Sequence, residues 1–192
     1  MPAGQRGFTL IELMVALAVL AILAVLAVPS FQDFRQRSAL RGAADQISIF
    51  WGNARFEALR RDSFVKVGFH TDGDQFCIGA ARRIDEDDNT ACDCLTAGAC
   101  DIAAYPASQR EWNGVRVASA TTLGSGDGLV IINPKRAGLT DSDDEGRIFL
   151  QAPANGPMDY RLNVVIDRNG RAFQCEPSAA PSKLSDYTGR QC

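Results

Sequence analysis

The sequence predicts an α+β fold in which one long N-terminal helix packs on antiparallel β-sheets. An apolar run near the N-terminus, helically spaced apolar residues after it, and short alternating segments between turn residues support this fold class. Beyond the apolar run, the 192-residue chain is long enough for one domain of ordinary size. The net charge of -3 gives no overall attraction to nucleic acid, so a DNA-binding surface would have to be a local basic patch.

The apolar run covers residues 8–28, and Thr9 and Glu12 are its only polar residues. A helix of this length is about 30 Å long, which matches the hydrocarbon thickness of a bilayer. A transmembrane helix, a signal peptide cleaved near Val25-Leu26-Ala27 and a helix that later packs against other helices all fit the run. Glu12 argues against a plain signal peptide, and a carboxylate in hydrocarbon is costly enough to indicate a function.

The helix is expected to continue through an amphipathic segment, residues 29–62, and to end near Arg61. Its apolar positions recur at helical spacing: Leu40, Ala43, Ala44, Ile47, Phe50, Trp51, Ala54 and Ala58. The opposite face carries Arg41, Asp45, Arg55 and Arg60. We interpret the apolar stripe as the part of the helix that a sheet covers, rather than as a cofactor site.

Residues 63–192 are expected to form an antiparallel β domain. Strands are predicted at residues 64–69, 75–78, 115–118, 129–132, 147–151, 160–166 and 171–175. The dipeptide Asp72-Gly73 is expected to join the first two strands, and Asn169-Gly170 the last two. Residues 82–106 contain no strand pattern and are expected to form one long loop.

Six cysteines follow the apolar run: Cys77, Cys92, Cys94, Cys100, Cys175 and Cys192. An even number of cysteines behind an export-type segment favours disulfides in an oxidising compartment. The alternative is a thiolate metal site in the 92–100 region. That region lacks the usual C-x2-C spacing, and the lone His70 is distant in sequence.

The cysteine positions also suggest how the disulfides are arranged. Cys92 and Cys94 are too close to pair comfortably with each other, so Cys77 is expected to bridge into the long loop. Cys175 with Cys192 is the favoured pair at the C-terminus. This bond would close a proline-containing tail that needs a covalent restraint.

The string Gly7-Phe8-Thr9-Leu10-Ile11-Glu12 resembles the prepilin processing motif of type IV pilins and type II secretion pseudopilins. The short basic leader and Pro29 at the end of the apolar run fit the same family. The resemblance implies that residues 1–7 are a cleaved leader and that prepilin peptidase cuts between Gly7 and Phe8, after which Phe8 is N-methylated. It also implies the type IV pilin fold, with residues 8–28 first transmembrane and later in a filament core, and with a helix bend at Pro29.

This resemblance gives Glu12 a partner. Cleavage would create a charged amine at Phe8, one helical turn before Glu12, and in a filament Glu12 of one subunit can face the Phe8 amine of a neighbour. Two buried charges that are expensive alone are tolerable as a pair. The alternative is a glutamate whose head reaches the cytosolic lipid headgroups. We therefore expect Phe8 and Glu12 to direct subunit docking.

The resemblance also implies a location and a set of partners. The protein would sit in the inner membrane with a cytoplasmic N-terminus and a periplasmic globular domain, and would later join a pilus at the cell surface. Expected partners are other pilins and minor pilins, prepilin peptidase, the inner-membrane assembly platform, and the membrane before assembly. Basic residues lie on both sides of the apolar run, so charge alone does not fix the orientation.

The chain looks most like the GspH/FimT branch of minor pilins and pseudopilins, which implies a structural role in starting type IV pilus assembly near the tip. A type II secretion pseudopilin and a DNA-receptor minor pilin for natural transformation are the alternatives. Some members of that branch bind DNA through a Gly-Arg-x-Arg motif. Gly170-Arg171 and Gly189-Arg190 match only its first half, because Phe173 and Cys192 replace the second arginine.

Other candidate sites have weaker support. A basic face could still form from Arg161, Arg168, Arg171, Lys183 and Arg190. The acidic residues Asp141, Asp143 and Asp144 could bind calcium, but they lack EF-hand spacing and a solvated turn is favoured. His70 is expected at the surface, and Gly124, Gly126 and Gly128 are not followed by the helix that a phosphate loop needs. We expect no catalytic residues, no cofactor and no enzymatic activity.

Overall fold

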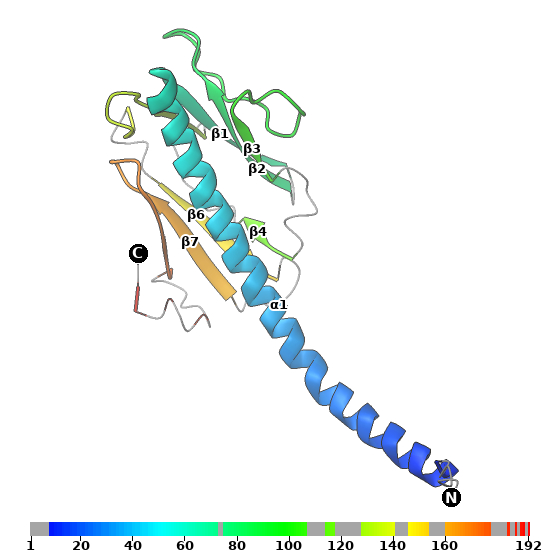
Figure 1. Ribbon diagram of the computed structural model, residues 1–192. Helices are drawn as coiled ribbons and strands as arrows, with labels where there is room; N and C mark the ends of the chain where they lie inside the picture. Colours follow the sequence, from blue (N-terminus) through cyan, green and yellow to red (C-terminus); the bar gives the residue numbers. More distant parts are fainter. Residues whose placement is uncertain are drawn as a thin grey trace, which may run out of the picture. The chain divides into compact units, whose positions relative to one another are not determined.

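The computed structural model describes residues 8–72, 75–106, 114–117, 128–140, 146–153, 160–177, 184, 187, 189–190 and 192. The chain divides into two compact units, one up to Arg35 and one from Gln36 onward. The helix α1 (Leu10–Arg61) contributes to both units and contains Pro29 (Figure 1). The second unit also holds every strand found among the described residues, so the α+β fold predicted from the sequence is confirmed.

The C-terminus of α1 is closed by a Schellman motif. The amide of Asp62 donates to the carbonyl of Leu59 at 3.3 Å, and the amide of Ser63 donates to that of Ala58 at 3.2 Å. Asp62 has a φ of 43°, the left-handed conformation that this motif requires. The helix therefore ends at Arg61, where its end was predicted from the sequence.

The strands form two four-stranded antiparallel sheets. The first has the order β3 (Ala103–Tyr105), β2 (Gln75–Arg82), β1 (Val65–Asp72) and β5 (Leu129–Ile132). The second has the order β4 (Arg116–Val117), β6 (Gly146–Ala152), β7 (Tyr160–Ile166) and β8 (Ala172–Cys175). In Figure 1 the second half of α1 lies across both sheets.

One core joins the second half of α1 to both sheets. Every residue of the apolar stripe predicted from the sequence is buried, and Trp51 has no exposed surface. The alternate residues of β7 that face this core are Tyr160, Leu162, Val164 and Ile166, and β6 contributes Ile148 and Leu150. A helix with 3.6-residue periodicity and strands with two-residue periodicity thus bury their apolar faces against each other.

Two side chains of α1 bind the turns of the two sheets. Trp51 Nε1 donates to the carbonyl of Gly170 at 2.9 Å, and Arg55 Nε donates to the carbonyl of Ala137 at 2.6 Å. Gly170 has a φ of 69°, and an added Cβ would lie 2.9 Å from the Ala137 carbonyl oxygen. Arg55, which the sequence places on the face opposite the apolar stripe, is half-buried at this junction.

Two strand predictions need correction. Residues 82–106 are not strandless, because β3 lies within them and pairs with β2 through Ala80↔Ala103 and Ile78↔Tyr105. The segment has no alternating pattern of its own, so only its pairing partner reveals it as a strand. The first hairpin is also longer than predicted, which places exposed His70 inside β1, opposite Cys77, rather than at the strand end.

Candidate assembly site

The N-terminus of α1 has a capping box. The hydroxyl of Thr9 accepts a hydrogen bond from the backbone amide of Glu12 at 3.3 Å. In return, Glu12 Oε2 accepts a hydrogen bond from the backbone amide of Thr9 at 3.2 Å. The two side chains also bond to each other at 3.2 Å. Thr9 at the N-cap and Glu12 three residues later therefore satisfy two amides that the first helical turn leaves without intrahelical partners.

This capping box gives Glu12 a local role that was not among its predicted ones, although the Thr-x-x-Glu spacing is a known signal for it. A carboxylate in the first turn is further stabilised by the helix dipole. The two oxygens of a carboxylate together accept about four hydrogen bonds, so the capping contacts do not exhaust the capacity of Glu12 for a second partner. Capping and pairing with an amine are compatible.

The apolar residues of α1 in the first unit are exposed. From Leu13 to Val28, each large apolar side chain that the structure describes has at least half of its surface accessible. This part of α1 is long and apolar enough to cross a membrane. So much exposed apolar surface requires lipid or protein around it, which is consistent with the membrane anchor of a pilin.

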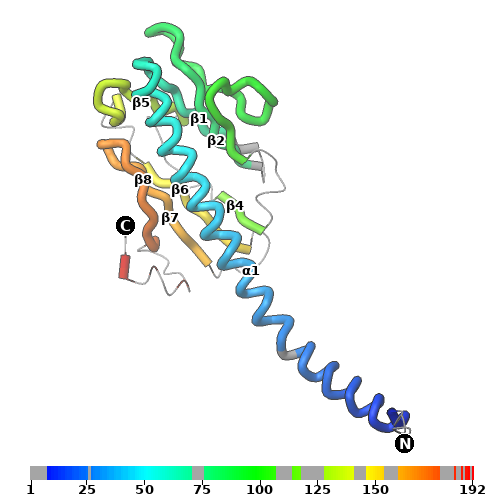
Figure 2. Tube along the Cα trace, viewed as in Figure 1, coloured from blue at the N-terminus to red at the C-terminus, as the bar shows by residue number. Residues whose placement is uncertain are grey.

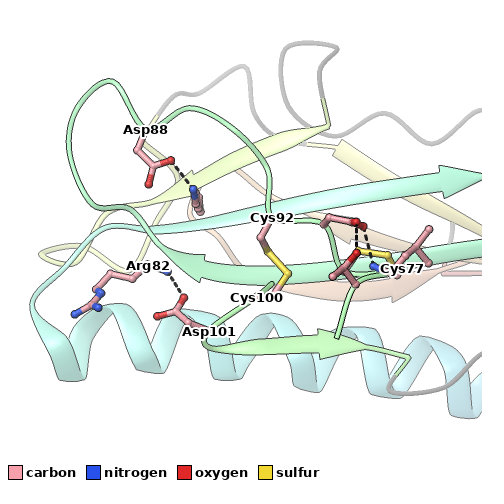
Figure 3. Close-up of a disulfide and its surroundings, with 11 residues drawn as sticks. Cys77, Arg82, Asp88, Cys92, Cys100 and Asp101 are labelled. Atoms are coloured by element: carbon pink, nitrogen blue, oxygen red, sulfur yellow. Dashed lines mark hydrogen bonds and ion pairs between the residues drawn. A yellow bond between two sulfur atoms is a disulfide. The ribbon is translucent and has the colours of Figure 1, made fainter. Parts of the chain in front are cut away.

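All six cysteines form disulfides. Cys77 is joined to Cys94, Cys92 to Cys100, and Cys175 to Cys192, which is the C-terminal pair that the sequence favoured. The Cys77–Cys94 bond attaches residues 83–102 to β2 of the first sheet, and the Cys92–Cys100 bond closes a loop within this segment, which we call the cysteine cap (Figure 3). The thiolate metal site considered as an alternative does not form, because no cysteine is free.

A pair of glycines makes room for the cysteine cap. Gly68 of β1 and Gly79 of β2 are directly opposite each other on the sheet face that points away from α1. A Cβ on Gly79 would collide with the sulfur of Cys100 and would lie 2.8 Å from that of Cys92. A Cβ on Gly68 would likewise collide with Ala91. The missing side chains therefore allow the cap to lie directly on the sheet.

Polar contacts also attach the cap. Lys66 Nζ lies 2.5 Å from Asp88 Oδ1, and the backbone amide of Arg82 donates to Asp101 Oδ1 at 2.8 Å (Figure 3). The pKa of Asp88 lies below its usual range because Lys66 donates to the carboxylate and the Ile84 amide donates a second bond. The pKa of Asp93 is also lowered, chiefly by the hydroxyl of Thr96. These acids are thus engaged within the chain.

The C-terminal tail closes on the end of β8. The amide of Glu176 donates to the carbonyl of Arg190 at 2.8 Å, and the amide of Cys192 donates back to the carbonyl of Glu176 at 3.1 Å. Buried Asn163 of β7 donates to the sulfur of Cys192 at 3.4 Å. The Cys175–Cys192 bond therefore ties together segments that are also hydrogen-bonded through their backbones.

The arginines of the two half-motifs lie at opposite ends of β8. Arg171 precedes the strand, and its side chain forms an ion pair with Asp167 at 3.2 Å. Beyond the other end, the backbone carbonyl of Arg190 accepts a hydrogen bond from the amide of Glu176. At a rise of 3.3 Å per residue, the Cα atoms of Arg171 and Glu176 are roughly 16 Å apart. The backbone positions of the two arginines are therefore not adjacent.

Several predicted positions lie outside the described residues: Gly7, the calcium candidates Asp141, Asp143 and Asp144, the glycines Gly124 and Gly126, and Lys183. Phe8 is described, and its side chain is exposed. Gly128, the last of the alternating glycines, precedes β5 rather than a helix. Arg161 and Arg168 lie on β7 and in the turn after it.

Comparison with known proteins identifies the N-terminal segment. Residues 2–28 match the prokaryotic N-terminal methylation motif. No curated protein and no solved structure matches the chain. The matched segment contains the processing string, the capping box and the exposed apolar part of α1. Together with the α+β fold, this motif supports a type IV pilin-like or pseudopilin protein that is processed by prepilin peptidase and assembles with other pilins.

Proposed function

We propose that the protein is a structural minor pilin of the GspH/FimT type, which helps to initiate type IV pilus assembly near the pilus tip. The observation that carries this proposal is the methylation motif over residues 2–28, whose exposed apolar segment, residues 8–28, contains a single carboxylate, Glu12. The domain behind the helix is stabilised by three disulfides, as expected for a periplasmic or surface location. The role is structural and requires no catalysis.

In this proposal, residues 1–7 are removed and Phe8 is methylated, with the N-terminus in the cytoplasm before assembly. Glu12 then pairs with the Phe8 amine of a neighbouring subunit and fixes the axial position of one helix against the next. Loss of either partner would leave the other charge buried and uncompensated, which is strongly destabilising. Pro29 would supply the bend that lets the apolar segment adapt to the filament.

The capping box makes a sharper test available than removal of the side chain. Glu12→Gln keeps a side chain that can occupy the capping box but removes the charge, whereas Glu12→Ala removes both. We expect both variants to insert into the membrane and to be processed, and both to enter pili at least tenfold less than the wild type. Quantitative immunoblots of membranes and sheared pili measure this.

If Glu12→Gln entered pili as well as the wild type while Glu12→Ala did not, helix capping would explain Glu12 and the charge pair would be refuted. Mass spectrometry of the mature N-terminus provides the control for processing. A methylated Phe8 is expected, and a mature chain that starts near Val28 would contradict the pilin proposal.

A type II secretion pseudopilin is the alternative that shares the same helix and motif. It predicts that the chain copurifies with secretion pseudopilins rather than with pilus subunits. The DNA-receptor alternative is less favoured, because the two half-motifs are separated by β8 and Arg171 is already paired with Asp167. Salt-dependent binding of duplex DNA that is lost in Arg171→Ala would support it nevertheless.

A further inference from the structure

The two disulfides of the cysteine cap interleave along the chain. One bond joins Cys77 to Cys94 and the other joins Cys92 to Cys100, so neither loop lies inside the other. If Cys92 and Cys94 changed places, the bonds would join consecutive cysteines instead, as Cys77–Cys92 and Cys94–Cys100. We call this second arrangement the consecutive pairing.

Loop entropy does not select the native pairing. The native bonds join cysteines 17 and 8 residues apart, whereas the consecutive pairing joins cysteines 15 and 6 residues apart. Because the entropic cost of closing a loop grows with its length, an unfolded chain favours the consecutive pairing by about twofold. The third combination needs a bond between Cys92 and Cys94, which are too close in sequence to pair comfortably.

The direction of export favours the consecutive pairing as well. In the orientation that we propose, the domain crosses the membrane behind α1, from its N-terminal to its C-terminal end. Cys77 and Cys92 then reach the oxidising compartment before Cys94 and Cys100. The first bond to form during export is therefore expected to be Cys77–Cys92.

The folded sheet selects the native pairing instead. Cys77 and Gly79 lie on the face of β2 that points away from α1. A Cβ on Gly79 would collide with Sγ of Cys100, and it would lie 2.8 Å from Sγ of Cys92 and 2.9 Å from Cβ of Cys94. In Figure 2 the green trace of the cap leaves the end of β2 and folds back beside it. The cysteines thus gather on a formed strand, and bonds made before the sheet must be exchanged.

We propose that a periplasmic thiol–disulfide isomerase, a dithiol enzyme, converts the consecutive pairing into the native one. The enzyme thiolate attacks Cys92 in the Cys77–Cys92 bond and releases the Cys77 thiolate. Cys77 then attacks Cys94 and releases the Cys100 thiolate. Finally Cys100 attacks Cys92 and releases the enzyme thiolate. These three exchanges form both native bonds without net oxidation or reduction.

Burial preserves the native bonds after the exchange. Cys77 has no exposed surface and Cys94 has 8%, whereas Cys92 and Cys100 are half-buried. Thiol–disulfide exchange depends on access to the sulfur that is attacked. The Cys77–Cys94 bond therefore resists further exchange once the cap has packed on the sheet. The inference rests on the proposed function only for the oxidising location and the direction of export.

Disulfide mapping of the full-length chain tests the inference. The chain is taken from membranes of cells that contain or lack the isomerase, with the same thiol oxidant in both. Cleavage before aspartates, including Asp93, separates Cys92 from Cys94. The native pairing then holds three peptides together, whereas the consecutive pairing gives one linked pair of peptides and one internally bonded peptide. Mass spectrometry distinguishes these products.

Without the isomerase, we expect the native cap pairing, measured per chain synthesised, to fall about threefold or more. Reduced glutathione added to the isolated membranes should restore it, because a small thiol can start the same exchanges. The Cys175–Cys192 bond is the internal control, because it joins consecutive cysteines and should form fully in both kinds of cell.

Two double variants provide matched controls. Cys92→Ser with Cys100→Ser leaves only consecutive pairs, so its Cys77–Cys94 bond should form equally with and without the isomerase. Cys175→Ser with Cys192→Ser keeps the interleaved bonds and should depend on the isomerase as the wild type does.

Three results are informative against the inference. Equal native pairing in the two kinds of cell would overturn it, and so would a Cys92→Ser, Cys100→Ser variant that still needs the isomerase. Both results would leave the pilin proposal intact. Six free thiols in the membrane-bound chain would contradict the inference and the proposed location together, because they would place the domain in a reducing compartment.

Discussion

The core of the second unit and the cysteine cap are stabilised in different ways. The core consists of apolar side chains from α1 and both sheets, and Trp51 and Ile47 at its centre have no exposed surface. The cap contains few buried residues. One disulfide and an ion pair attach it over a pair of glycines, and a second disulfide closes a loop within it. A segment without its own apolar core can thus be ordered when covalent bonds limit its freedom.

The largest expected effect on stability comes from a substitution in the core. Trp51→Ala removes a fully buried indole and its hydrogen bond to Gly170, and should lower the free energy of unfolding by about 3–5 kcal/mol. Denaturant unfolding of the full-length chain in micelles, followed by far-UV circular dichroism, measures this. Phe173→Ala, which removes an exposed aromatic ring, should change it by less than about 0.5 kcal/mol. Equal effects would mean that the core is not the stabilising region.

A smaller effect is expected when a disulfide of the cap is removed, and it tests whether the cap can open without unfolding of the core. A double variant, Cys92→Ser with Cys100→Ser, opens a short loop and should favour opening of the cap by roughly 2.5 kcal/mol. Limited proteolysis within residues 84–101 should accelerate strongly, while the unfolding of the core changes much less. A loss of core stability as large as that of Trp51→Ala would show that the two regions are not independent.

The smallest effect concerns the ion pair of the cap. The pKa of Asp88 is lower in the folded state than in the unfolded state. The stability that this carboxylate contributes to the cap is therefore complete above the unfolded-state pKa of about 4 and is lost as the pH falls through the folded-state pKa. Asp88→Asn should therefore speed amide exchange at Ile84 a few-fold at pH 7, relative to the wild type at the same pH. The two proteins should converge at low pH.

Glu86→Gln is the control for this pH effect. It removes the same charge from the acidic run without touching Lys66, and we expect it to leave the exchange of Ile84 unchanged. If Glu86→Gln had the same effect as Asp88→Asn, general repulsion among the acids would explain the result, and the specific pair with Lys66 would not.

The predictions from the sequence succeeded where one local signal was sufficient. The buried stripe of α1 and its end at Arg61 follow from helical periodicity, and β5 and β7 have the predicted bounds. The prediction failed at β3, which has no alternation of its own and exists because β2 offers its edge. The sequence also did not indicate the hydrogen bond of half-buried Arg55, whose partner is a carbonyl 82 residues away.

The sequence by itself determined the methylation motif and the apolar length of the first half of α1, because each depends on residues within a few helical turns. Only the tertiary structure decided which cysteines pair with Cys92 and Cys94, that Gly68 and Gly79 together make room for the cap, and that Arg171 and Arg190 lie apart. The physical reason is that these features depend on strand register and on contacts between distant segments, which residue spacing does not encode.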